Sequence, residues 1–159
     1  MKVAVCLSGQ PRNYKKSFQT IQNSFLSELD VDFYFHSWKD TEYKSTDFGN
    51  GGHKYSFKPS EFNKLIDLYQ PVKYSIENPI LFDASGFKCP IWRQPLNNTM
   101  SMYYSIYKSF NLIDENEKYD YIVRSRFDID FSVFNPKLNG VLQIPKWHND
   151  DRVLNKGLH

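Results

Sequence analysis

Charged residues alternate with apolar ones along residues 121–131, which read Tyr-Ile-Val-Arg-Ser-Arg-Phe-Asp-Ile-Asp-Phe. Side chains of a strand alternate between its two faces and recur on one face about every 6.6 Å, for a rise of about 3.3 Å per residue. A strand here would therefore carry four charges on one face: Arg124, Arg126, Asp128 and Asp130. Carboxylates bind hard divalent cations and guanidinium groups bind phosphate, so the row predicts a metal and polyphosphate site. A solvated amphipathic strand, or an ion network between the arginines and the aspartates, gives the same pattern.

Two more polar segments follow predicted strands. Residues 3–7 are a continuous apolar run, typical of a strand covered on both faces, and the turn-rich segment 8–12 comes next. The strand predicted over residues 31–35 ends in His36-Ser37-Trp38. In open α/β sheets ligands bind beyond the carboxyl ends of the strands, so neighbouring strands would gather these segments into one crevice. A simple tight turn and a covered sheet end are the alternatives.

Strand and helix patterns alternate along the chain. This order predicts an α/β three-layer domain with a mainly parallel, Rossmann-like sheet flanked by helices, and 159 residues suit one such domain. Between the first two strands we expect a helix with apolar residues from Phe18 to Leu29, and after the second a long polar loop over 39–58. A helix from Ser60 to Tyr69, a strand over 72–76 and an irregular connection over 78–96 follow. A further helix begins at Asn97 or Asn98, with an apolar stripe of Tyr103, Ile106, Tyr107, Phe110 and Ile113, and a last strand is expected over 140–144.

Composition excludes several classes of protein. A net charge of +2 gives no electrostatic argument for nucleic acid. Cys6 and Cys89 are the only cysteines, too few for a disulfide framework or a zinc cluster. Fingerprints of dinucleotide sites, P-loops and serine hydrolases are absent. The apolar run 3–7 is too short for a signal peptide or a membrane span, so we expect a cytoplasmic protein.

Three segments in combination resemble a known family. Residues 6–13, 32–38 and 119–130 are similar to the nucleotide- and metal-binding strands of small GT-A-type glycosyltransferase domains, whose metal motif is D-x-D. The resemblance implies a metal-dependent glycosyltransferase of the hexosyltransferase class. Its donor would be a nucleoside-diphosphate sugar, most often a UDP-sugar, bound with Mn²⁺ or Mg²⁺, and its acceptor an unknown glycan or protein.

The resemblance also assigns roles to residues. Asp130 would bind the metal directly, and Asp128 would bind it through water or contact the ribose or the donor sugar. The nucleotide-binding set that it implies is Leu7, Ser8, Gly9, Arg12, His36, Trp38, Met102, Arg126 and Asp128, with His36 or Trp38 near the base. For Met102, core packing is the alternative.

The chain departs from the family after Asp130, where such enzymes continue into an acceptor-binding half. We therefore expect a single minimal domain over residues 1–159, with the acceptor half short or absent. Its remaining candidates are Asp150 and Asp151 as catalytic groups and His148 and His159 as metal ligands. The alternatives are a nucleotide-sugar-binding module without efficient transfer, a nucleotidyltransferase of similar fold, and a non-enzymatic interaction domain.

Overall fold

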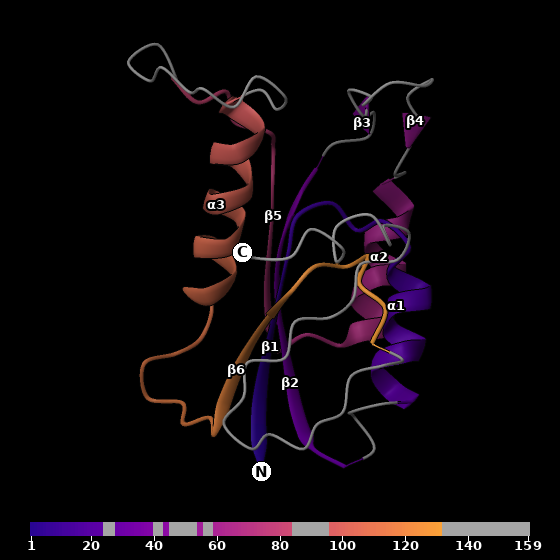
Figure 1. Cartoon of the computed structure of the whole chain (residues 1–159), viewed down its shortest axis with the longest axis vertical. Coiled ribbons are helices and arrows are strands. Elements are labelled where there is room, and N and C mark those ends of the chain that lie inside the picture. The colour runs from indigo at the N-terminus through magenta and orange to yellow at the C-terminus, as the bar shows by residue number, and fades with distance from the viewer. Residues whose placement is uncertain (24–27, 40–42, 45–53, 56–58, 84–95, 132–159) are drawn as a thin grey trace, which may run out of the picture.

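Four parallel strands form the middle layer of the molecule, with α3 on one face and α1 and α2 on the other (Figure 1). The structure, a computed structural model, describes residues 1–23, 28–39, 43–44, 54–55, 59–83 and 96–131. Its elements are β1 (Lys2–Ser8), α1 (Tyr14–Ile21), β2 (Asp30–Trp38), β3 (Tyr43–Lys44), β4 (Lys54–Tyr55), α2 (Pro59–Tyr69), β5 (Lys73–Glu77), α3 (Leu96–Phe110) and β6 (Tyr121–Ser125). The predicted α/β fold, a parallel sheet between helices, is confirmed.

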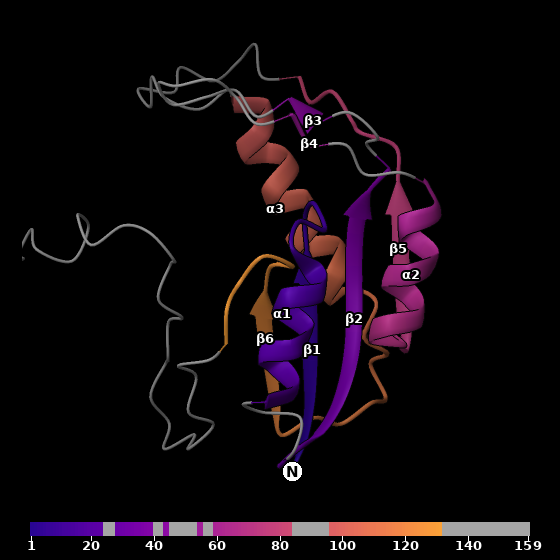
Figure 2. The same cartoon turned by 90° about the vertical axis from the view of Figure 1, so that its right-hand side faces the viewer.

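The sheet has the strand order β5-β2-β1-β6. The chain passes from β1 outward to β2 and β5, then returns to the other side of β1 with β6. All four strands run the same way, so their carboxyl ends share one end of the sheet (Figure 2). The order therefore reverses between β1 and β6, and open α/β sheets bind ligands beyond such a reversal.

Aromatic residues fill the core between the sheet and the helices α1 and α2. The Phe18 ring lies 4.7 Å from that of Tyr69, which lies 5.1 Å from that of Phe33. Phe127, which is fully buried, packs 5.5 Å from Phe35. Edge-to-face aromatic pairs contribute about 0.5–1.5 kcal/mol each beyond their buried area. This core holds the segment after β6 against the middle of the sheet.

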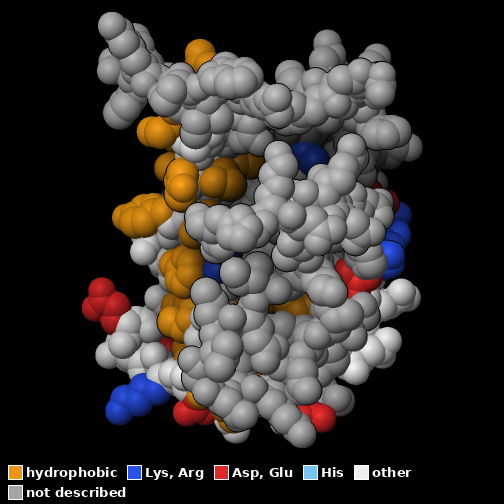
Figure 3. All heavy atoms as spheres, in the orientation of Figure 1, with side chains coloured by type: hydrophobic (Ala, Val, Ile, Leu, Met, Phe, Trp, Pro, Cys, Tyr) orange, Lys and Arg blue, Asp and Glu red, His pale blue; other side chains and the backbone are white. Residues whose placement is uncertain are grey.

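The opposite face of the sheet is covered by α3 through small side chains. Ser105 and Ser109 are fully buried, and they lie over a sheet face that includes the small residues Ala4 and Cys6. The predicted apolar stripe of α3 is therefore wrong in part, because Tyr103 and Tyr107 are 62% and 64% exposed. Small side chains let the helix approach the sheet closely, and Tyr103 and Tyr107 turn outward. Hydrophobic side chains accordingly line the α3 side of the surface (Figure 3).

The strand β6 ends earlier than the sequence predicts. Alternation continues to Phe131 in the sequence, but the strand stops at Ser125 and a turn follows at Phe127 and Asp128. Two contacts explain the end: Phe127 leaves the sheet edge to enter the core, and the backbone N–H of Phe131 donates to Thr20 Oγ1 on α1 at 2.9 Å. The four charges of this segment therefore do not form one straight row.

Other boundaries differ by smaller amounts. The helix α1 spans Tyr14–Ile21; of the residues predicted to continue it, Phe25 and Leu26 lie outside the described residues and Leu29 is not helical. The two-residue strands β3 and β4 pair antiparallel within the predicted loop 39–58. The strand predicted over 140–144 lies outside the described residues. Among the helices that the structure describes, none has the length and apolarity needed to cross a membrane.

Candidate functional site

A pocket of about 370 Å³ opens beyond the carboxyl ends of β1 and β6, where the strand order reverses. Its size falls within the range of small-molecule sites, about 300–1,000 Å³. It collects residues from the turn after β1, the end of β2, the segment after β5, the first turns of α3, and β6 with the residue after it. Segments more than 110 residues apart in the chain therefore meet in one concave site, as the carboxyl-end argument predicts.

The turn after β1 forms one wall of the pocket through Ser8, Gly9, Gln10 and Arg12. Gly9 has φ +99°, a conformation that L-residues rarely adopt, and a Cβ placed there would meet nothing within 4 Å. Its N–H donates to the carbonyl oxygen of His36 at 3.2 Å and to Ser105 Oγ at 2.9 Å. The turn is thus fastened to both β2 and α3, and its backbone is open to a ligand.

Three guanidinium groups line the pocket: those of Arg12, Arg124 and Arg126. The side chain of Arg124 makes no hydrogen bond or ion pair with any residue that the structure describes. Its pKa lies below the usual value, first because of partial loss of hydration and then because of the neighbouring charge of Arg126. No Asp or Glu is among the lining residues that the structure describes. The pocket is therefore cationic, and an anion would relieve the repulsion between the two arginines.

The remaining walls are polar on one side and apolar on the other. Asn97, Asn98 and Ser101 come from the start of α3, where the helix dipole leaves a partial positive charge. Trp38 and Met102 add apolar surface, and residues 79–80 after β5 complete the wall. An apolar wall beside a cationic one suits a ligand that joins a ring to a phosphate.

The two aspartates of the D-x-D pattern lie outside this lining. Asp128 accepts two hydrogen bonds from Arg126, from Nε at 2.8 Å and from a terminal nitrogen at 2.6 Å. An Asp130 oxygen lies 3.9 Å from the Lys16 ammonium. Hard oxygens are suitable ligands for Mg²⁺ or Mn²⁺. As arranged, however, both carboxylates face cations of the chain, and no three acidic, His or Cys groups converge on a metal position within the described ranges. A cation bound by Asp128 would therefore have to compete with the guanidinium of Arg126.

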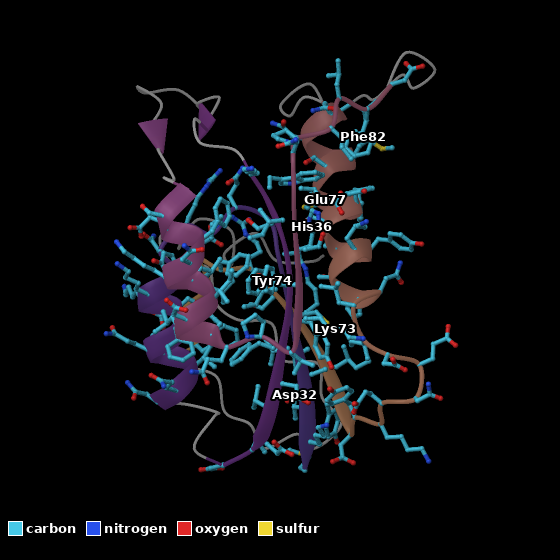
Figure 4. The ribbon with its side chains drawn as sticks, turned by 180° about the vertical axis from the view of Figure 1, so that it is seen from behind. Asp32, His36, Lys73, Tyr74, Glu77 and Phe82 are labelled. Atoms are coloured by element: carbon cyan, nitrogen blue, oxygen red, sulfur yellow. The ribbon has the colours of Figure 1, made fainter. Side chains whose placement is uncertain are left out.

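A buried polar network supports the pocket from behind. His36 Nδ1 lies 2.8 Å from Ser105 Oγ, and His36 Nε2 lies 3.8 Å from Glu77 Oε2, between β5 and α3 (Figure 4). The carboxylate favours the imidazole proton on Nε2, so the Ser105 hydroxyl donates to Nδ1 and accepts from the Gly9 N–H. Burial lowers the pKa of His36 to about 4, which keeps the ring neutral.

Glu77 anchors the outer end of this network. Lys108 Nζ lies 2.7 Å from Glu77 Oε1, and the hydroxyls of Tyr104 and Ser75 donate to the same carboxylate at 2.9 and 3.1 Å. Burial opposes the charge of Glu77, but these hydrogen bonds outweigh it and lower its pKa to about 2. Because His36 and Ser105 are fully buried, the network positions the turn at Gly9 and cannot itself reach a ligand.

The structure brings together most of the nucleotide-binding residues implied by the resemblance. Those that line the pocket are Ser8, Gly9, Arg12, Trp38, Met102 and Arg126. Leu7 and His36 are fully buried and do not line it, and Asp128 reaches it only through its pairing with Arg126. The candidates His148, Asp150, Asp151 and His159 lie outside the described residues.

Sequence reasoning gave Arg124 no place in the nucleotide-binding set, although it identified the row of charges to which Arg124 belongs. Arg124 lies near the carboxyl end of β6, the strand that pairs with β1, and this position could have indicated that it faces the pocket. Gln10 belongs to the turn expected in the crevice but was given no role of its own. Asn97, Asn98 and Ser101 were missed, since residues at the start of a helix have ordinary structural reasons to be polar.

Comparison with known proteins adds no assignment. No family model matches the chain, and no curated protein and no solved structure matches it significantly.

Proposed function

We propose that the pocket binds a nucleoside-diphosphate sugar, with a UDP-sugar as the favoured donor, and that the chain transfers the sugar to an acceptor as a glycosyltransferase. The single observation that carries the proposal is the cationic pocket at the reversal of strand order, with Arg12, Arg124 and Arg126 in its walls. Crevices at this place in α/β sheets bind nucleotides, and guanidinium groups bind phosphate in a bidentate manner.

Different walls of the pocket suit different parts of the donor. The diphosphate would lie against the three arginines and the open backbone at Gly9. The base would lie against the apolar wall that Trp38 and the exposed Met102 line; the Trp38 ring is 5% exposed and stacks on Tyr104, so it supports this wall from behind.

The chemistry follows from charge. In transfer, the bond between the anomeric carbon and the β-phosphate oxygen breaks, and its electron pair leaves with the nucleoside diphosphate. An acceptor oxygen bonds to the carbon, and its proton passes to a base. Negative charge grows on the departing diphosphate, where preorganised cations lower the barrier most. Arg12, Arg124 and Arg126 supply such cations. A Mn²⁺ or Mg²⁺ ion at Asp128 and Asp130 stays a prediction of the resemblance, and the proposal does not depend on it.

The experiment is a ligand panel followed by a turnover assay. Thermal melts with UDP, GDP, CMP and dTDP identify the nucleotide, and UDP should raise the melting temperature most. Incubation with the matching nucleotide sugars, read by mass spectrometry, should then release free nucleoside diphosphate above the rate of a buffer control. Binding without release would support a binding module that lacks transfer. Failure of every nucleotide to bind would refute the proposal.

A further inference from the structure

The charges lining the pocket are opposite in sign to those of its proposed ligand. A nucleoside diphosphate carries about three negative charges at neutral pH, since its terminal phosphate has a second pKa near 6. Among the described residues, the lining holds three arginines and no Asp, Glu, Lys or His, while Asp128 outside the lining pairs with Arg126. Three guanidinium groups less one carboxylate leave two net positive charges, so these side chains neutralise most of the charge of a diphosphate without a divalent cation.

Among the described residues, the carboxylates that could recruit a cation are held by the chain itself. Both Asp128 oxygens accept N–H groups of Arg126, in a fork geometry that makes such pairs strong. The Asp128 side chain is only 18% exposed, and that of Asp130 is 13% exposed near the Lys16 ammonium. A cation entering here would have to displace the guanidinium from Asp128 and lose most of its own hydration.

Arg126 belongs both to the lining of the pocket and to the ion pair with Asp128. Its guanidinium lines the pocket while two of its nitrogens donate to Asp128. The carboxylate therefore fixes the direction of Arg126, and the neighbouring Arg124 has no such partner within the described part of the chain. Asp128 thus acts as a positioning residue for a cation that faces the ligand.

We propose that the pocket binds a diphosphate through Arg12, Arg124 and Arg126 without a divalent cation, so that the arginines perform the neutralisation that the resemblance assigns to a metal. This inference rests on the proposed function for the identity of the ligand, but it concerns how the phosphates are held. The same site should accept inorganic pyrophosphate, which has the phosphates and lacks the nucleoside.

The test is calorimetric titration of the whole chain with UDP and with inorganic pyrophosphate, each in excess EDTA and again in excess Mn²⁺. We expect both ligands to bind in EDTA, with affinities that Mn²⁺ leaves nearly unchanged. Arg124→Gln should weaken both by about tenfold or more, the usual effect of losing a hydrogen bond to a charged group. Because Arg124 is exposed, this variant should keep the melting temperature of the unliganded parent. Arg12→Gln is the second variant.

The controls separate the roles of charge and metal. Lys118→Gln removes an exposed cation away from the pocket and should leave both affinities unchanged. Asp130→Asn removes the expected metal ligand and should also leave them unchanged. Arg124→Lys, which keeps the charge but loses the fork, should fall between the parent and Arg124→Gln.

Each other outcome overturns a defined part of the account. UDP binding that requires Mn²⁺ and disappears in Asp130→Asn would overturn this inference and leave the proposed function standing. Pyrophosphate binding in EDTA without binding of any nucleotide would refute the proposed function and support the arginine site. No binding of either ligand, or equal binding by the parent and Arg124→Gln, would overturn the arginine site.

Discussion

Replacing Ser105 with alanine should loosen the support of the pocket at a measurable cost. The hydroxyl of Ser105 is fully buried, and it bonds to His36 Nδ1 at 2.8 Å and accepts from the Gly9 N–H at 2.9 Å. In Ser105→Ala, His36 Nδ1 loses the only partner that the structure shows for it. The Gly9 N–H keeps its bond to the carbonyl oxygen of His36 at 3.2 Å. The loss therefore falls mainly on His36.

The magnitude follows from these contacts. A buried polar group left without a partner costs about 1–3 kcal/mol. Alanine recovers up to roughly 0.5 kcal/mol, because it is a better helix former than serine. We expect Ser105→Ala to lower the free energy of unfolding by about 2 kcal/mol. For a chain of this length that corresponds to a fall of roughly 4–8 °C in melting temperature.

Ser109 provides a matched control one helical turn further along α3. It is as fully buried as Ser105, but its hydroxyl donates to the carbonyl oxygen of Ile106, within the helix. Ser109→Ala should change the free energy of unfolding by less than about 0.5 kcal/mol. Equilibrium urea denaturation of both variants measures the difference. Equal losses in the two variants, or a larger loss in Ser109→Ala, would refute the view that Ser105 links α3, His36 and the turn at Gly9.

Three further predictions concern the core and the network. Burial lowers the pKa of His36 from 6.5 to about 4, so on acidification the unfolded chain takes up the proton before the folded one. The free energy of unfolding should therefore be highest above about pH 6.5 and fall by up to about 3 kcal/mol as the pH drops to 4. In urea melts across this range His36→Asn should flatten the slope, and parallel curves for parent and variant would contradict the assignment. Tyr119→Phe should lower the free energy of unfolding by about 1–2 kcal/mol, because it removes hydrogen bonds to the Tyr34 hydroxyl at 2.6 Å and to Asp32 Oδ2 at 2.7 Å. Tyr121→Phe, at an exposed position, should change it little in the same denaturation assay. Burial raises the pKa of the Cys6 thiol to about 12, so a thiol reagent should leave it unlabelled, as read by mass spectrometry, until denaturant is added. Rapid labelling of the folded protein would show that β1 is less protected than described.

The sequence was enough to predict the layered fold because its apolar patterns have physical causes that act locally. The continuous apolar run in β1 is needed at the centre of a parallel sheet, where both faces are covered. Pro71 follows α2 closely, and the alternating residues after it form β5 as predicted. The polar segments after the strands were expected to meet only if the strands were neighbours, and β1 does pair with both β2 and β6.

Local patterns failed where tertiary contacts decided the outcome. The stripe on α3 looked like a core-facing surface, but the helix turns Tyr103 and Tyr107 outward because small serines fit against the sheet. Period-two alternation continued past Ser125, yet the packing of Phe127 against Phe35 ended the strand. Sequence spacing cannot show which of two compatible faces will meet a neighbour.

The candidate site was predictable in location and less so in its electrostatics. Turns after β1 and β2 were expected to meet near the charged end of β6, and the pocket lies there. The alternative of an ion network between the arginines and the aspartates holds for one pair, since Arg126 donates two hydrogen bonds to Asp128, but the pattern did not show which arginine would pair with which acid.

A crystal structure of the chain grown with uridine diphosphate tests the central claim most directly. The account predicts both phosphates within hydrogen-bonding distance of Arg12, Arg124 or Arg126, beside the open backbone at Gly9, with the base against the wall that contains Trp38. A nucleotide bound elsewhere on the chain, with this pocket holding only solvent, would contradict it.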